Sequence, residues 1–398
     1  MGWTKSLKGR DGSGVEAGLA RWVGPVAALV IIGQVGVQML GRIAPGAVRF
    51  PGAFGPVLTP DSPGYLQAAS ELPAIRAEYL TKTLYLLLLR FDQALSLGGW
   101  GVVLLQLFVL TLAGTAVATL VARHHGGRAA VLTAAVLVMN PQISQWAQAI
   151  LTDSLFISLV VVLAVLLARF LELRTSPLPP LLLGAALVFL RPNGLGALVG
   201  VVVVVILRMR RLRAVTALLS IAVVAAVLLL APGFQTPGGE ENTLAARTYE
   251  GLVIWMGESD VRIAMPEPAQ PDDLTNAGLV RYAAANPLAV LQLGLLRVGW
   301  ELIQIRPHYP AAVNGIVALQ MLTLAVLGLI GLRRNVRASL GPAVVALSAG
   351  LLLVIAGTWA IAEGRFGWAV LAMWSPWVGI GADALLNLLR PGRSGPVD

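Results

Sequence analysis

Long apolar runs separated by short polar segments make up most of this chain. About 20 consecutive apolar residues, coiled as a helix, are enough to cross the hydrocarbon core of a bilayer. The pattern predicts about ten transmembrane helices, which places the chain in the class of all-α polytopic membrane proteins. The predicted spans are residues 22–45, 99–122, 128–140, 153–172, 178–190, 194–207, 213–231, 311–331, 339–361 and 367–389.

Three of these spans, 128–140, 178–190 and 194–207, are at or below the length that crosses a full bilayer. Helices that stop inside a membrane are tolerated only where they face protein or water, because lipid offers no partner to backbone polar groups. The short spans therefore predict a cavity that is cut into the membrane domain.

The composition supports the membrane class and excludes several others. The hydrophobic fraction is 57% and the charged fraction is 12%, against about 25% charged residues in a soluble domain. Cysteine is absent, which excludes disulfides and thiolate metal sites, and three histidines argue against a multi-histidine metal site. The net charge of +9 in so apolar a chain indicates a basic cytoplasmic membrane surface rather than a nucleic-acid partner.

The charged residues predict which side of the membrane each loop faces. Lysine and arginine gather before the first span and in alternate loops after it, whereas most acidic residues fall in the other loops. Basic loops tend to stay in the cytoplasm. We therefore expect a multi-pass plasma-membrane protein with both termini in the cytoplasm.

Polar segments on the expected outer side divide the chain into parts. The first of them has apolar residues at helical spacing, which predicts one or two helices along the interface. In the longest, Asn286-Pro287 opens an amphipathic helix that is expected to run through Leu302. The expected parts are a cytoplasmic tail at 1–21, a membrane core at 22–231 with outer loops at 46–98 and 140–153, a small extracytoplasmic cap at 232–310, C-terminal transmembrane helices at 311–390 and a second cytoplasmic tail at 391–398.

A carboxylate stands just beyond the first predicted span, in the run Pro60-Asp61-Ser62-Pro63-Gly64-Tyr65. Charged residues in a membrane domain are usually kept for chemistry, ion handling or transport rather than for stability. The simpler alternative is that Asp61 caps a helix or forms a turn, because Asp-Ser-Pro-Gly is also a favourable turn sequence.

Several short motifs follow one another along the predicted outer segments. They are Asp61-Ser62-Pro63-Gly64-Tyr65, Arg76-Ala77-Glu78-Tyr79, Asn140-Pro141 followed by Leu151-Thr152-Asp153-Ser154-Leu155, Leu190-Arg191-Pro192-Asn193-Gly194, and Glu363-Gly364-Arg365-Phe366. With these motifs in this order, the chain resembles the GT-C-fold glycosyltransferases over most of residues 20–390. It is most similar in layout to their protein mannosyltransferase and aminoarabinose transferase branch. It departs from that branch in the lone first-loop acid and in lacking a large soluble C-terminal domain.

The resemblance implies an inverting transfer of one sugar from a polyprenyl-phosphate donor to a glycan, lipid or protein of the cell envelope, outside the membrane. It makes Asp61 the general base, a role typically worth about 10²–10⁴-fold in rate. Asp153 is the second catalytic candidate, with a helix N-cap as its alternative. The two carboxylates from separate loops are also candidates to share Mg²⁺ or Mn²⁺, which take oxygen ligands.

Four basic residues are candidates for binding the donor phosphate. Arg191 and Arg365 come first, because the planar guanidinium matches phosphate oxygens. Arg76 and Lys82 are further candidates for the same phosphate. The alternative for such long side chains is that they reach out to lipid headgroups.

A further set of residues is expected to line the substrate path. The aromatic members have the membrane-interface belt as their commoner explanation, and Glu78 has an ion pair with Lys82, one helical turn later. These residues are Tyr65, Glu78, Asn193, Glu363 and Phe366.

A lipid-linked-sugar flippase or small-solute transporter is the alternative function. It would use the same outer carboxylates and arginines for binding without chemistry. Transporters hold their sites near the midplane and reach them from both faces, whereas these candidates gather on one side. The enzyme hypothesis requires that Asp61, Asp153, Arg191 and Arg365 lie close together in the fold.

Overall fold

The structure is a computed structural model of the whole chain. It describes residues 13–43, 54–74, 77–208, 244–255, 260–270, 272–306, 309–335, 339–358, 360–361 and 365–389. The predicted span 213–231 lies outside the described residues.

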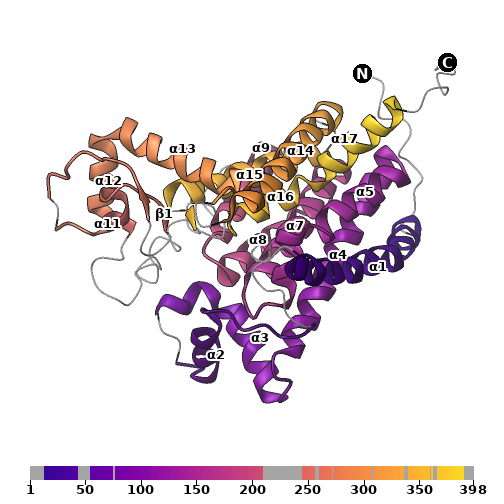
Figure 1. Ribbon diagram of the computed structural model, residues 1–398, viewed down its shortest axis with the longest axis horizontal. Coiled ribbons are helices and arrows are strands. Elements are labelled where there is room, and N and C mark those ends of the chain that lie inside the picture. The colour runs from indigo at the N-terminus through magenta and orange to yellow at the C-terminus, as the bar shows by residue number, and fades with distance from the viewer. Residues whose placement is uncertain are drawn as a thin grey trace.

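A bundle of apolar helices forms the largest part of the molecule, on the right in Figure 1. Most of them begin and end within a few residues of a predicted span. The helices of this bundle are α1 (Ser13–Ile43), α4 (Trp100–His125), α5 (Gly127–Val138), α7 (Asp153–Leu173), α8 (Leu178–Leu190), α9 (Gly194–Arg208), α14 (Ala311–Asn335), α15 (Leu340–Gly357), α16 (Gly367–Met373) and α17 (Ser375–Leu388).

The structure confirms the prediction of a helical membrane protein, but it does not confirm the prediction of ten transmembrane spans. Among the described residues, five helices are long and apolar enough to cross a bilayer, or up to seven if each of two bent helix pairs is one span. The short helices α5, α8 and α9 fall outside that count. With 12 residues and a rise of 1.5 Å per residue, α5 extends about 18 Å, well short of the hydrocarbon core of about 30 Å.

Apolar side chains on the outside of the bundle are compatible with a lipid environment. Leu104 and Phe108 on α4 are 57% and 65% exposed, and Leu319 and Leu322 on α14 are similarly open. Isolated exposed leucines are ordinary in soluble proteins, but whole helix faces of them mark a surface meant for an apolar phase.

Glycines let the helices of the bundle approach backbone to backbone. A Cβ atom on Gly196 of α9 would lie 2.4 Å from the carbonyl oxygen of Gly350 on α15, and one on Gly200 would lie 2.6 Å from that of Ala346. Small residues four apart are the usual means of close helix packing in membranes, where the hydrophobic effect does not drive helices together.

The helices predicted for the first polar segment are present below the bundle in Figure 1, and we call them the outer helices. They are α2 (Ser62–Ser70), the 3-10 helix η1 (Ala77–Lys82) and α3 (Thr83–Ala94). Two short turns, α6 (Pro141–Ser144) and η2 (Gln145–Gln148), precede α7. Both η1 and α3 pack against α8, which connects the outer helices to the bundle.

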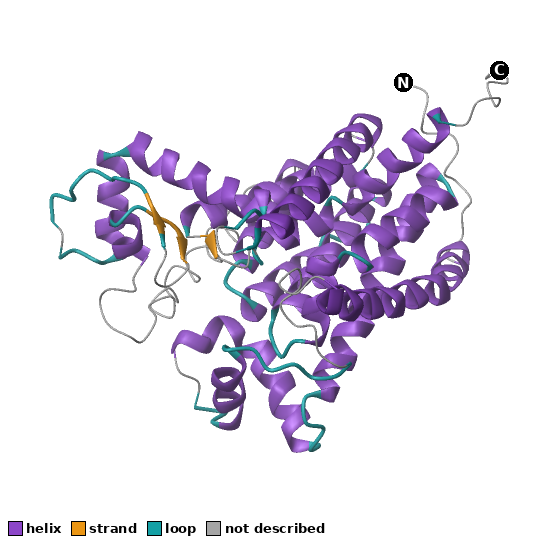
Figure 2. Cartoon of the chain, in the orientation of Figure 1, coloured by secondary structure: helices purple, strands orange, loops and turns teal. Residues whose placement is uncertain are grey.

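The predicted cap contains α11 (Leu244–Tyr249), α12 (Asn276–Ala285) and α13 (Pro287–Ile303), so the amphipathic helix expected from Asn286-Pro287 is confirmed. It also contains a small sheet that the apolar pattern did not predict, visible in orange in Figure 2. The strand order is β2 (Val261–Arg262), β1 (Leu252–Trp255), β3 (Ala360–Ile361). Strands this short leave no periodic signal, and β3 comes from the far end of the chain.

We expect Gly196→Ala to lower the unfolding temperature of the purified protein. The added methyl would overlap the Gly350 carbonyl, and overpacking of this kind costs about 1–3 kcal/mol. Thermal unfolding in detergent measures the effect. Gly36→Ala is the matched control, because Gly36 is an exposed position on α1 with nothing within 4 Å of a new Cβ. Equal midpoints for the two variants would contradict close packing of α9 on α15.

Candidate functional site

Asp61 is positioned by a turn that is bonded to the loop before α7. The backbone N–H of Thr59 donates to the Ser62 hydroxyl at 2.8 Å, and that hydroxyl donates to the Ile150 carbonyl at 3.0 Å. Two residues earlier, Val57 exchanges backbone bonds of 2.8 and 2.9 Å with Gln148 and Ile150. These bonds bring the segment around Asp61 beside the segment that leads into α7.

The side chain of Asp61 does not act as a helix cap. Asp61 occupies the N-cap position of α2, but its carboxylate makes no capping bond to that helix. Instead, Oδ2 accepts a hydrogen bond of 3.0 Å from Nη1 of Arg365. The Asp61 side chain is 48% exposed and that of Arg365 is 18% exposed, so the pair opens to solvent mainly at Asp61.

Arg365 also faces the second predicted carboxylate. Its Nη1 lies 3.9 Å from Oδ2 of Asp153. Asp153 is the first residue of α7 and is 1% exposed, and it forms an ion pair with Arg191. Thr152, not Asp153, occupies the N-cap position. The four charged residues therefore alternate in the order Asp61, Arg365, Asp153, Arg191, and they come from four separate elements.

Arg191 is held inside the protein. It follows the last residue of α8, and its side chain is 7% exposed. Its guanidinium lies 4.7 Å from the ring centroid of Phe366 and 5.8 Å from that of Phe156. The alternative in which Arg191 reaches to lipid headgroups is therefore wrong, because the charge is paired and stacked in the interior. Phe366, which was expected to line the substrate path, therefore packs on Arg191.

A group of tyrosines lies beside Asp61 on the outer helices. Nζ of Lys82 is 5.1 Å from the ring centroid of Tyr65 and 5.2 Å from that of Tyr79. Tyr65 also meets Tyr85 edge to face at 5.7 Å. Lys82 thus has its charge over aromatic faces, a favourable arrangement for a partly buried cation.

Tyr85 is a residue that sequence reasoning missed. It is fully buried on α3, and its hydroxyl has no hydrogen-bond partner among the described residues. Burial, reinforced by Tyr65 and Asp153, raises the pKa of Tyr85 well above its ordinary value. The hydroxyl therefore stays neutral near the carboxylates. Only the tertiary fold brings it there, since nothing in the sequence around residue 85 distinguishes it from a core tyrosine.

Other predicted residues are placed less centrally or lie outside the description. Asn193 is buried in the turn after Arg191, and no hydrogen bond among the described residues joins its side chain to either carboxylate. Arg76 and Glu363 lie outside the described residues, as does the side chain of Glu78.

A guanidinium lies between the two carboxylates that were expected to share a divalent metal. Mg²⁺ and Mn²⁺ need several oxygen ligands in close geometry. Here the two carboxylates face each other across the Arg365 guanidinium, which occupies the place of a shared cation.

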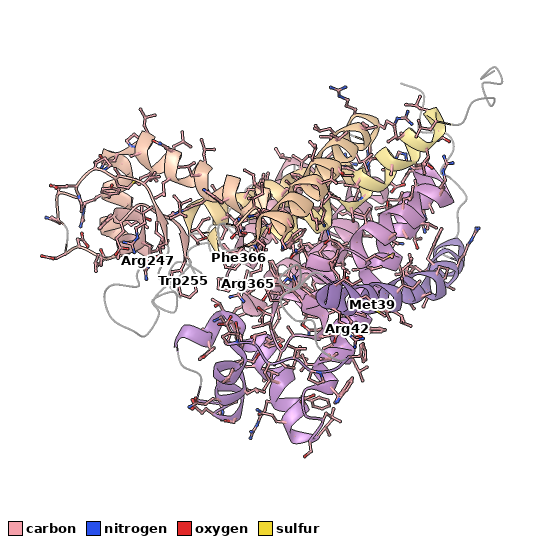
Figure 3. The ribbon with its side chains drawn as sticks, in the orientation of Figure 1. Met39, Arg42, Arg247, Trp255, Arg365 and Phe366 are labelled. Atoms are coloured by element: carbon pink, nitrogen blue, oxygen red, sulfur yellow. The ribbon has the colours of Figure 1, made fainter. Side chains whose placement is uncertain are left out.

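Figure 3 shows where the site lies in the molecule. Arg365 and Phe366 stand near the centre, between the cap elements and the outer helices. Trp255 and Arg247 lie toward the cap in this view, and Arg42 lies toward the other side, at the end of α1. The site is therefore at the meeting point of the bundle, the cap and the outer helices.

Comparisons with protein-family models, with curated proteins and with solved structures found no match to this chain. The geometry of the site consequently carries the functional argument.

We expect Asp153→Ala to destabilise the fold far more than Asp61→Asn. Removing Asp153 leaves the Arg191 charge buried without its partner, and breaking a buried pair costs about 3–5 kcal/mol. An exposed pair such as Asp61–Arg365 contributes about 0–1 kcal/mol. Thermal unfolding of both variants measures the difference. The double variant Asp153→Ala, Arg191→Ala should lose less than the sum of its single variants, and strictly additive losses would contradict the buried pair.

Proposed function

We propose that this chain is a membrane glycosyltransferase that moves one sugar from a polyprenyl-phosphate donor to a hydroxyl of a cell-envelope glycan, lipid or protein. The observation that carries the proposal is the half-exposed Asp61 carboxylate beside the Arg365 guanidinium. A base and a phosphate-binding cation within one contact distance are the two groups that this transfer needs.

In the proposed step, the acceptor oxygen attacks the anomeric carbon of the sugar. The new carbon–oxygen bond forms as the bond from that carbon to the phosphate oxygen breaks, with inversion at the carbon. Asp61 takes the proton of the acceptor hydroxyl, and the bonding electrons leave with polyprenyl phosphate. The Arg365 guanidinium balances the charge that grows on the departing phosphate, the kind of electrostatic help that contributes most to many enzymes.

Arg365 has a partner before the donor arrives, and this shapes the order of events. The 3.0 Å contact to Asp61 is exposed and therefore weak. A donor phosphate offers a stronger bidentate partner for the guanidinium. Donor binding then releases Asp61 from its ion pair, so the base becomes available when the donor is in place.

Asp153 and Arg191 act indirectly in this mechanism, through their effect on Arg365. Their pair is buried, and Arg191 is stacked on Phe366, so neither side chain is open to a donor in the way that Arg365 is. The Asp153 carboxylate, 3.9 Å from Arg365, helps to hold that guanidinium in position. Lys82, whose charge lies over Tyr65 and Tyr79, is proposed to contact the sugar or its phosphate.

The distribution of charge supports a site on the extracytoplasmic side of the plasma membrane. The helix α7 starts at the site and ends near α4, where His124 lies 3.4 Å from Glu172. Basic residues mark that far end, with Arg123 in the last turn of α4 and Arg208 in that of α9. Basic ends face the cytoplasm in most membrane proteins, so the site is proposed to face outward.

We expect Asp61→Asn to lower donor turnover by 10²-fold or more, because the amide cannot accept the acceptor proton. Purified protein would be given a panel of polyprenyl-phosphate sugars with an envelope extract, and released polyprenyl phosphate would be followed. Glu71→Gln is the matched control, since Glu71 ends the same helix and its carboxylate accepts a bond from Gln67.

The outcomes of this assay separate the candidate functions. Release that survives in Asp61→Asn would keep a transferase but assign its base elsewhere. Donor binding without release from any donor would favour the flippase.

We also expect turnover to persist after the protein is treated with EDTA and assayed without added metal. Arg365 already supplies the positive charge between the two carboxylates. Turnover that falls with EDTA and returns with Mg²⁺ or Mn²⁺ would show that a metal enters this site.

A further inference from the structure

The turn that carries Arg365 is bonded to the cap immediately after Phe366. The backbone N–H of Gly367 donates to Oε2 of Glu301 on α13 at 3.0 Å, and Glu301 is fully buried. The two backbones also touch, because a Cβ atom on Gly367 would lie 2.4 Å from the Glu301 carbonyl oxygen. Gly367 is therefore a position where the close approach of another chain segment requires glycine.

The cap also holds the chain before Arg365. The strand β3 pairs in parallel with β1, with Ala360 opposite Ile254 and Ile361 opposite Trp255. Since β1 belongs to the cap, this pairing holds the chain at Ile361, four residues before Arg365. Figure 2 shows the strands between the cap helices and the bundle.

Arg297, one helical turn before Glu301 on α13, connects these anchors to the bundle. It is 2% exposed. Its Nε donates to the Leu252 carbonyl of β1 at 2.9 Å, and its Nη1 donates to the Ala356 carbonyl near the end of α15 at 3.3 Å. One side chain thus binds the first residue of the strand and the membrane helix that leads into β3.

The burial of the charged side chains of Arg297 and Glu301 has to be explained, because it is costly. Taking a guanidinium or a carboxylate out of water costs several kcal/mol, and apolar residues of similar size often stabilise a fold better. Arg297 and Glu301 add directional bonds, which reach Gly367 just after Arg365, the strand β1 and the end of α15.

We propose that Glu301 and Arg297 are positioning residues, through which the cap helix α13 sets the Arg365 turn against Asp61. The effect on catalysis rests on the proposed transferase function, but the placement of the turn does not. This assigns the cap a mechanical part in the site besides any contact with an acceptor.

Cross-linking tests the placement without reference to activity. The natural chain contains no cysteine, so Asp61→Cys with Arg365→Cys creates one reactive pair and also removes the ion pair between those positions. A short bis-maleimide should join the two sites in high yield. Adding Glu301→Ala should lower the yield several-fold. Glu301→Gln, whose amide oxygen still accepts from Gly367, should retain most of it.

Glu250→Ala is the matched control, because Glu250 is an exposed cap acid with ion pairs to Arg247 and Arg262. Its yield should equal that of the parent pair. An unchanged yield in Glu301→Ala, or an equal fall in Glu250→Ala, would overturn the proposal. If Glu301→Ala does not fold, Arg297→Lys replaces it, since lysine cannot reach both carbonyls in the planar geometry of arginine.

A double-mutant cycle then tests the link to chemistry. Glu301→Ala should lower kcat by about 10–100-fold with little change in KM, because small misplacements of a catalytic group have effects of this size. In an Arg365→Ala background it should cost almost nothing more. If the losses in kcat from Glu301→Ala and Arg365→Ala multiply in the double variant, Glu301 has only a structural role. Absence of transfer in the natural protein would refute the proposed function while leaving the cross-linking result intact.

Discussion

The alternating ion pairs from Asp61 through Arg365 and Asp153 to Arg191 are the interactions on which the site depends. An acid buried alone in so apolar an interior costs several kcal/mol. Each charge is therefore met by an opposite one, and the four elements that carry them must meet for that to happen. The start of α2, the start of α7, the end of α8 and the turn before α16 converge for this reason. These charges specify the arrangement more than they add to stability.

Solvent exposure differs between the two ends of this series of four charges, and the two ends therefore have different roles. The Asp153–Arg191 end is buried and stacked against aromatic rings, whereas the Asp61–Arg365 end is open. The inner pair, Asp153–Arg191, is rigid, and the outer pair, Asp61–Arg365, can exchange. The Arg365 guanidinium is therefore held in place and can still change partners. A fully buried set of four would be unreachable, and a fully exposed set would be too loosely held to orient a reaction.

The cap is structurally continuous with this site. Its sheet includes a strand from the C-terminal part of the chain, and its helix α13 binds Gly367 after Arg365 and the strand β1 that pairs with β3. The outer helices are joined to the site in the same manner, through the Thr59–Ser62–Ile150 bonds. These short bonds between loops act together with the ion pairs to hold the charged groups in place.

The sequence by itself determined the membrane class and most helix boundaries, because apolar periodicity is a local property of the chain. The four charged candidates came from the order of the motifs along its polar segments, and the structure brings them together. The sequence did not determine the strands, since β1 and β3 are too short for a pattern and more than one hundred residues apart. Nor could it decide whether Asp61 capped a helix or whether Arg191 reached to lipid. Those choices depend on which side chains stand opposite each other, and only the packing of distant segments decides that. The same holds for Tyr85 and Glu301, which become part of the site only through the tertiary structure.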